Sequence, residues 1–105
     1  MDKTDALIIA QRYAKAVNEN FNSIRIILFG SYAKGNYNDD SDIDIAVVFK
    51  DYGNLIDMQL ELMRLRRKID SRIEPHPFRE IEFELSNPIV SEILKYGQEI
   101  NISVA

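Results

Sequence analysis

Two short apolar runs set the strongest limit on how this chain can fold. Residues 24–29 read Ile-Arg-Ile-Ile-Leu-Phe, and residues 43–49 read Ile-Asp-Ile-Ala-Val-Val-Phe. Runs of this length that are rich in β-branched residues and bounded by turn residues are typical of strands. The dipeptide Gly30-Ser31 directly follows the first run. The sequence therefore predicts a strand, a tight turn, a polar connection and a second strand.

Two carboxylates lie at the start of the second run, with the spacing of residues that share one face of a strand. Asp42 and Asp44 are two positions apart, and such residues in a strand point to the same face, about 6.6–7 Å apart along the chain. Two carboxylates this close repel each other unless a positive charge lies between them. Mg²⁺ prefers oxygen ligands and is commonly held by one or two carboxylates together with substrate phosphates. We therefore interpret Asp42 and Asp44 as metal ligands.

The Gly30-Ser31 turn is the candidate phosphate site. Glycine tolerates the backbone angles of a tight turn and lets a ligand approach the main chain. We expect Ser31 to cap a short helix over residues 32–34, whose free N–H groups would attract phosphate oxygens. The turn and the acidic pair together would hold a nucleoside triphosphate complexed with metal.

Two other interpretations of the acidic stretch explain it less well. In a calcium-binding loop that starts at Asp40, the position that requires glycine is occupied by Ile45. A merely solvated loop does not explain Asp44, because this residue lies within an apolar run where an unpaired charge would be costly.

Gly30-Ser31, ten further residues and then Asp42-x-Asp44 resemble the signature of the nucleotidyltransferase superfamily, the polymerase-beta-like enzymes. The short chain resembles the smallest branch, the minimal nucleotidyltransferases (MNT), which include MntA-like antitoxins of HEPN-domain ribonuclease toxins. The resemblance extends over essentially the whole chain. It implies an α+β fold with a small mixed β-sheet and helices packed on one side, and a single nucleotidyltransferase domain over residues 1–105.

The resemblance also implies site residues and a cofactor. In this superfamily two aspartates bridge two Mg²⁺ ions, a role that falls on Asp42 and Asp44, and a third carboxylate completes the catalytic site. Glu74 is the best candidate for the third position, although the family often has aspartate there and glutamate is one methylene longer. Asp57 and Asp70 compete for the role, but both fall in a helical pattern and are expected to face solvent.

The implied reaction is transfer of a nucleoside monophosphate, most simply AMP from ATP, to an acceptor hydroxyl. The implied partners are ATP or another nucleoside triphosphate, bound at Gly30 and Ser31, and a HEPN toxin that would be AMPylated and neutralised. An alternative stays open, in which the chain is a non-catalytic nucleotide-binding antitoxin that neutralises its partner by contact. Transfer to a small molecule or to RNA ends fits less well, because those relatives usually carry a further domain for the acceptor.

Helical periodicity predicts three longer helices in the rest of the chain. The first runs from Thr4 or Asp5 to Glu19, the second over about residues 55–69 and the third to Tyr96. Asn87 followed by Pro88 is a typical cap and first residue for the third helix. Residues 99–104 are a candidate for a last short strand.

A strand at Ile73 and Glu74 runs into Pro75-His76-Pro77. Prolines at alternate positions restrict this segment to an edge or a strand end. We interpret His76 as an exposed loop residue rather than an acid/base group or metal ligand. Residues 79–85 alternate charged and apolar side chains, which suits a strand or a short helix equally.

Composition excludes some functions. A chain of 105 residues with 46% apolar residues suits one compact domain, and the absence of cysteine excludes disulfides and thiolate chemistry. The formal net charge of −4 argues against general nucleic-acid binding. Because neither a signal peptide nor an apolar stretch of roughly 20 residues is seen, we expect no membrane association and a cytoplasmic location.

Overall fold

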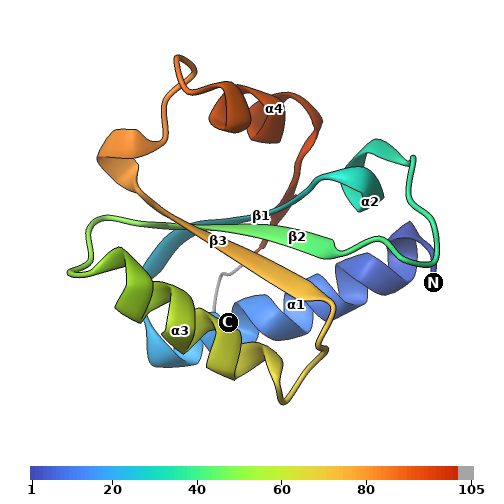
Figure 1. Cartoon of the computed structure of the whole chain (residues 1–105), viewed down its shortest axis with the longest axis horizontal. Helices are drawn as coiled ribbons and strands as arrows, with labels where there is room; N and C mark the ends of the chain where they lie inside the picture. Colours follow the sequence, from blue (N-terminus) through green and yellow to red (C-terminus); the bar gives the residue numbers. More distant parts are fainter. Residues whose placement is uncertain (102–105) are drawn as a thin grey trace.

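The two apolar runs form the centre of a four-stranded mixed sheet with the order β3-β2-β1-β4 (Figure 1). The computed structural model describes residues 1–101. The strands are β1 (Ser23–Phe29), β2 (Ile43–Phe49), β3 (Ile73–Arg79) and β4 (Gln98–Ile100). β1 is antiparallel to both β2 and β4, whereas β2 is parallel to β3. The predicted mixed sheet and α+β class are confirmed.

The two long helices, α1 (Lys3–Asn20) and α3 (Leu55–Arg66), cover one face of the sheet. Their apolar residues pack with alternate side chains of β1 and β2 in the main core. The Tyr13 hydroxyl donates a hydrogen bond to the Leu62 carbonyl at 2.7 Å and so joins the two helices. Burial raises the pKa of the Tyr13 phenol, so this hydroxyl stays a neutral donor.

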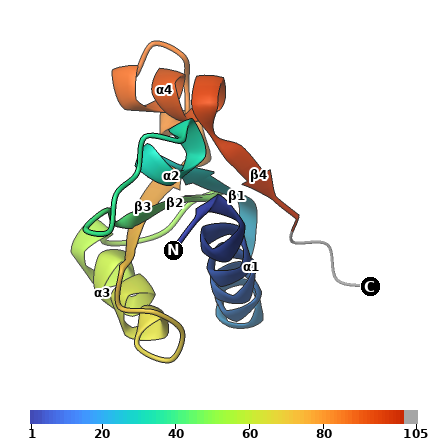
Figure 2. The ribbon, with the colours of Figure 1, turned by 90° about the vertical axis from the view of Figure 1, so that its right-hand side faces the viewer.

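The helix α4 (Pro88–Tyr96) lies on the opposite face, as Figure 2 shows, whereas the single turn α2 (Ser31–Lys34) follows β1 and packs Tyr32 and Ala33 into the main core. Ile93 of α4 packs with Ile27, Phe29 and Ala46, which are buried on that side of the sheet. The expectation of helices on one side therefore holds for α1 and α3, while α4 adds a smaller second layer. Asn87 caps α4 and Pro88 is its first residue, as predicted.

β3 is an edge strand, as its prolines predicted. Residues 73, 75 and 77 direct their backbone groups away from β2, so Pro75 and Pro77 cost no ladder hydrogen bond. Two side chains of α3 reach the outward carbonyls, where Arg66 donates to Ile73 at 2.9 Å and Gln59 donates to Pro75 at 3.0 Å. The outer edge of the sheet is thereby protected against pairing with another chain.

Several element ends differ from those expected. α1 begins one or two residues earlier than expected and ends one residue later, and α3 ends at Arg66 because residues 67–69 tighten into turns before Asp70. The strand at 73–74 continues to Arg79, and a short 3-10 helix, η1 (Glu80–Glu82), follows it. Of the predicted strand at 99–104, residues 99 and 100 belong to β4, Asn101 follows the strand, and residues 102–104 lie outside the described residues. Within residues 1–101 no helix is long and apolar enough to cross a membrane.

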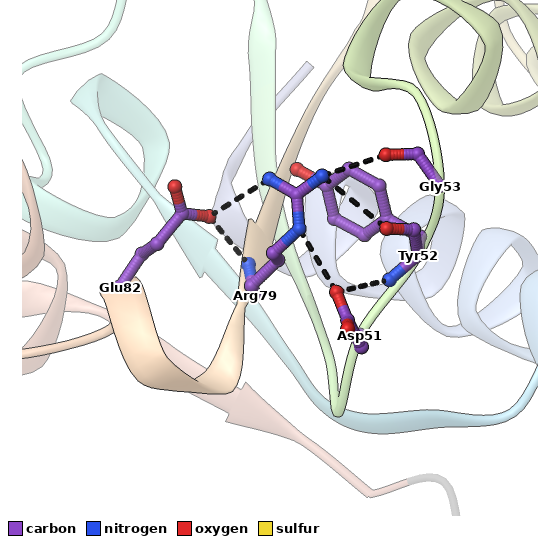
Figure 3. A network of polar contacts seen from close by, with 5 residues as sticks. All are labelled: Asp51, Tyr52, Gly53, Arg79 and Glu82. Atoms are coloured by element: carbon purple, nitrogen blue, oxygen red, sulfur yellow. Dashed lines mark hydrogen bonds and ion pairs between the residues drawn. The ribbon is translucent and has the colours of Figure 1, made fainter.

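Arg79, at the end of β3, ties three segments together (Figure 3). Its guanidinium donates to the Asp51 carboxylate at 2.9 Å and to the carbonyls of Tyr52 and Gly53 at 3.2 and 2.7 Å. It also lies 4.2 Å from the centre of the Tyr52 ring and forms an ion pair with Glu82 at 3.6 Å. This planar fork fixes the connection between β2 and α3 against the end of β3.

We predict that Arg79→Lys lowers the free energy of unfolding by about 1–2 kcal/mol, because a lysine ammonium cannot reproduce the fork. Urea unfolding measures the change. Arg64→Lys is the matched control, since Arg64 is exposed and pairs with Glu61 of the same helix, and it is expected to cost less than about 0.5 kcal/mol. Equal losses in the two variants would contradict the role assigned to Arg79.

Candidate functional site

Gly30 sits where β1 ends and α2 begins, in a conformation that favours glycine. Its φ is +74° and its ψ is −153°, a region that L side chains rarely adopt. A Cβ atom at this position would lie 2.4 Å from Oδ2 of Asp44. Phe29 and Asp44 are register partners in the β1–β2 pair. The turn and the acidic residue therefore touch, although they lie far apart along the chain.

Ser31 is the first residue of α2 and not its cap, so the predicted capping role is wrong. The cap position is Gly30, and no side chain bonds the first turn there. The reason is that the chain turns at Gly30, whose positive φ only glycine readily supplies. The N–H groups of the first turn still lack acceptors within the helix. The turn at Gly30 lies beside the Asp44 carboxylate, and these N–H groups remain the candidate phosphate donors.

Asp44 lies on the face of the sheet opposite the main core. Asp44 is the second residue of β2, and the strand alternation places its side chain opposite the buried Ile43 and Ile45. Asp42 precedes the strand and is exposed. The side chain of Asp44 is 26% exposed, so it can be reached from solvent while the rest of β2 is buried.

Glu74 is the register partner of Asp44 across the parallel β2–β3 pair. Directly opposed residues of neighbouring strands share a face and stand about 4.8 Å apart at the backbone. Glu74 is exposed. The structure therefore brings the predicted third carboxylate to the strand position next to Asp44.

The two competing carboxylates are placed differently. Asp70 lies in the turn before β3 and is bound by Arg72, with contacts of 2.9 and 2.6 Å. The hydrogen bond from Arg72 lowers the pKa of Asp70. Its expected exposure to solvent is thus wrong, because Arg72 covers it. Asp57 lies exposed in the first turn of α3.

His76 is part of β3 and contacts Asp44, so its interpretation as an exposed loop residue is wrong. Its Nε2 lies 3.1 Å from Oδ1 of Asp44. Its ring meets the Phe29 ring edge to face, with centroids 5.0 Å apart. Side chains two positions apart in a strand share a face, so a strand that continued past Glu74 would place His76 on the same face as Glu74. This pattern could have located His76 at the site. The prolines left open whether this segment was an edge strand or the end of a strand, and this signal was missed.

The donor atoms of this face fit a divalent cation. Three carboxylates supply only oxygen ligands, as hard cations prefer. Within residues 1–101, no three His, Cys, Asp or Glu side chains lie close enough together to hold a metal ion. Within that range the side chains of Asp42 and Glu74 form no hydrogen bond or ion pair, although the backbone of Glu74 is paired with β2. They can therefore turn toward Asp44 without losing an existing contact.

The sequence matches a known domain over most of its length. The family model described as a nucleotidyltransferase domain matches residues 10–100. The chain is similar to two Methanocaldococcus jannaschii proteins that are named as candidate protein adenylyltransferases. One is 32% identical over 79 residues, covering 72% of this chain and 77% of that protein. The other is 41% identical over 59 residues, covering 47% of this chain and 59% of that protein.

Solved structures share the fold. A crystal structure of a toxin–antitoxin with AMP-PNP has a TM-score of 0.69 and 26% identity, covering 89% of this chain and 73% of that chain. A candidate nucleotidyltransferase from Sulfolobus solfataricus has a TM-score of 0.62 and 30% identity, covering 76% of this chain and 72% of that chain. Nucleotidyltransferases generally use divalent metal ions. The chain belongs to the nucleotidyltransferase domain family.

Proposed function

We propose that this protein transfers AMP from ATP to a hydroxyl group of a partner protein, with two Mg²⁺ ions held by Asp42, Asp44 and Glu74. The observation that carries the proposal is the contact between the Gly30 turn and Asp44, since a Cβ at residue 30 would lie 2.4 Å from the carboxylate. A phosphate bound at the turn would thus lie directly beside a metal ligand. Mg²⁺ is commonly bound in this way, by carboxylates and substrate phosphates together.

The relatives support the nucleotide and the class of acceptor. Both curated relatives are named as candidate protein adenylyltransferases. AMP-PNP, an analogue of ATP, is present in the toxin–antitoxin structure that shares this fold. Another toxin–antitoxin structure, of an MntA–HpeT mutant, has a TM-score of 0.66 and 26% identity. We therefore propose a HEPN toxin as the acceptor protein and the cytoplasm, where ATP is available, as the location.

Each part of the site has one task in this reaction. The N–H groups that begin α2 would bind triphosphate oxygens, and the three carboxylates would hold the metal. Bound Mg²⁺ lowers the pKa of the attacking hydroxyl and stabilises the departing pyrophosphate. The acceptor oxygen forms a bond to the α-phosphorus while the bond from that phosphorus to the bridging oxygen breaks. Pyrophosphate leaves, and the hydroxyl proton passes to water.

We predict that Asp44→Asn lowers AMP transfer by about 100-fold or more, because losing several kcal/mol of charge stabilisation corresponds to that factor. The measurement is label transfer from α-³²P-ATP to the purified HEPN partner in the presence of Mg²⁺. Asp57→Asn is the control, since Asp57 is an exposed carboxylate on α3, and it should stay within twofold of wild type.

Transfer that persists unchanged in Asp44→Asn would show that this carboxylate does not act in the chemistry. A folded Asp42→Ala/Asp44→Ala variant that still protects cells fully from the toxin would favour neutralisation by contact alone. Loss of protection in that variant would favour the transfer reaction.

We predict that Gly30→Ala lowers AMP transfer at least about tenfold, because its methyl group displaces the Asp44 carboxylate as well as straining the backbone. Gly35→Ala is the matched control. Gly35 also has a positive φ, +88°, but nothing lies within 4 Å of its Cβ position. Both variants should lower the melting temperature, and only Gly30→Ala should impair transfer. Equal loss of activity in the two variants would contradict the proposed contact.

A further inference from the structure

The two oxygens of the Asp44 carboxylate face different neighbours, His76 and the Gly30 turn. Oδ1 lies 3.1 Å from Nε2 of His76. Oδ2 is directed to the turn, where it would lie 2.4 Å from a Cβ at Gly30. An ionised carboxylate can only accept hydrogen bonds, so Nε2 must carry the hydrogen in this contact. The arrangement leaves Oδ2 directed toward the side where the nucleotide would bind.

The imidazole ring is itself held in place. Pro75 and Pro77 fix the backbone φ on both sides of His76. The register partner of His76 is Ala46, a small and fully buried residue, which leaves space for the ring to lie along the sheet toward Asp44. The Phe29 ring packs against the imidazole edge to face at an interplanar angle of 65°. The side chain of His76 is only 31% exposed.

We infer that His76 is a positioning residue that orients Asp44 for metal binding. Groups that hydrogen-bond to metal ligands fix the orientation of those ligands, and removing them typically weakens metal binding or activity 10- to 100-fold. The His76 N–H can do this for Asp44 by occupying Oδ1 and preventing rotation of the carboxylate. The inference rests on the metal site of the proposed function, and it adds a residue that the acidic motif does not contain.

Two substitutions test the hydrogen bond and the aromatic ring of His76 separately. His76→Phe keeps an aromatic ring against Phe29 and removes the donor, whereas His76→Gln keeps an N–H donor and removes the ring. Phe78→Leu is the control for general disturbance of β3, because Phe78 lies on the same face but contacts Phe83. Mn²⁺ affinity in the presence of AMP-PNP, measured by electron paramagnetic resonance, reports on the site without requiring turnover.

The expected result is that His76→Phe binds Mn²⁺ about tenfold more weakly than wild type, while His76→Gln and Phe78→Leu stay within about threefold. Wild-type affinity in His76→Phe, or equal weakening in His76→Gln, would overturn the inference. If these affinities follow the expected order but wild type transfers no AMP to the partner, the proposed function fails and the positioning role stands.

A second measurement needs no metal. Long-range ¹H–¹⁵N spectra of the metal-free protein should show a proton on Nε2 of His76, and Asp44→Ala should shift the Nε2 and Nε2–H resonances because the hydrogen bond is lost. A proton on Nδ1 alone in the wild-type protein would overturn the inference whatever the activity, because Nε2 could then not donate to Asp44.

Discussion

The close contact between the Gly30 turn and the Asp44 carboxylate is the constraint on which the candidate site depends. It requires β1 and β2 to be antiparallel neighbours with Phe29 opposite Asp44. It also requires a residue without Cβ at a positive φ, because any side chain at position 30 would occupy the space of Oδ2. Glycine has no Cβ and readily adopts a positive φ. A backbone turn and a carboxylate thus come together where β1 ends.

The sheet itself keeps acidic groups and core on separate faces. Ile43 and Ile45 belong to the core under α1 and α3, and the alternation of the strand turns Asp44 to the other face. Parallel pairing with β3 adds Glu74 and His76 to that same face. The face of α4 therefore carries the candidate site, while the face of the long helices supplies most of the apolar burial that holds the strands in register.

The parts of the fold that depend on local patterns could be predicted from the sequence. The strands at 24–29 and 43–49 follow from β-branched runs, and the start of α4 follows from Asn87-Pro88. Strand periodicity also predicted that Asp44 points away from Ile43 and Ile45, whereas Asp42 precedes the strand. The relation of Asp44 to Gly30 also needed the pairing of two strands, which the family resemblance implied and local pattern could not supply.

The predictions that failed depend on contacts between segments that are distant in the chain. Ser31 was expected to cap α2, but the turn falls one residue earlier because the close approach to Asp44 demands glycine. His76 was expected in a loop, but parallel pairing with β2 extends β3 through its prolines. Residues 79–85 could not be assigned because contacts of Arg79 with residues 51–53 help determine where β3 ends.

A crystal structure with Mn²⁺ and AMP-PNP would test the central claim most directly, because anomalous scattering locates the ions without ambiguity. We expect ions about 2.1 Å from oxygens of Asp42 and Asp44, with Glu74 turned toward them and the triphosphate at the N–H groups that follow Gly30. Ions bound away from Asp44, or a triphosphate remote from Gly30, would contradict the account.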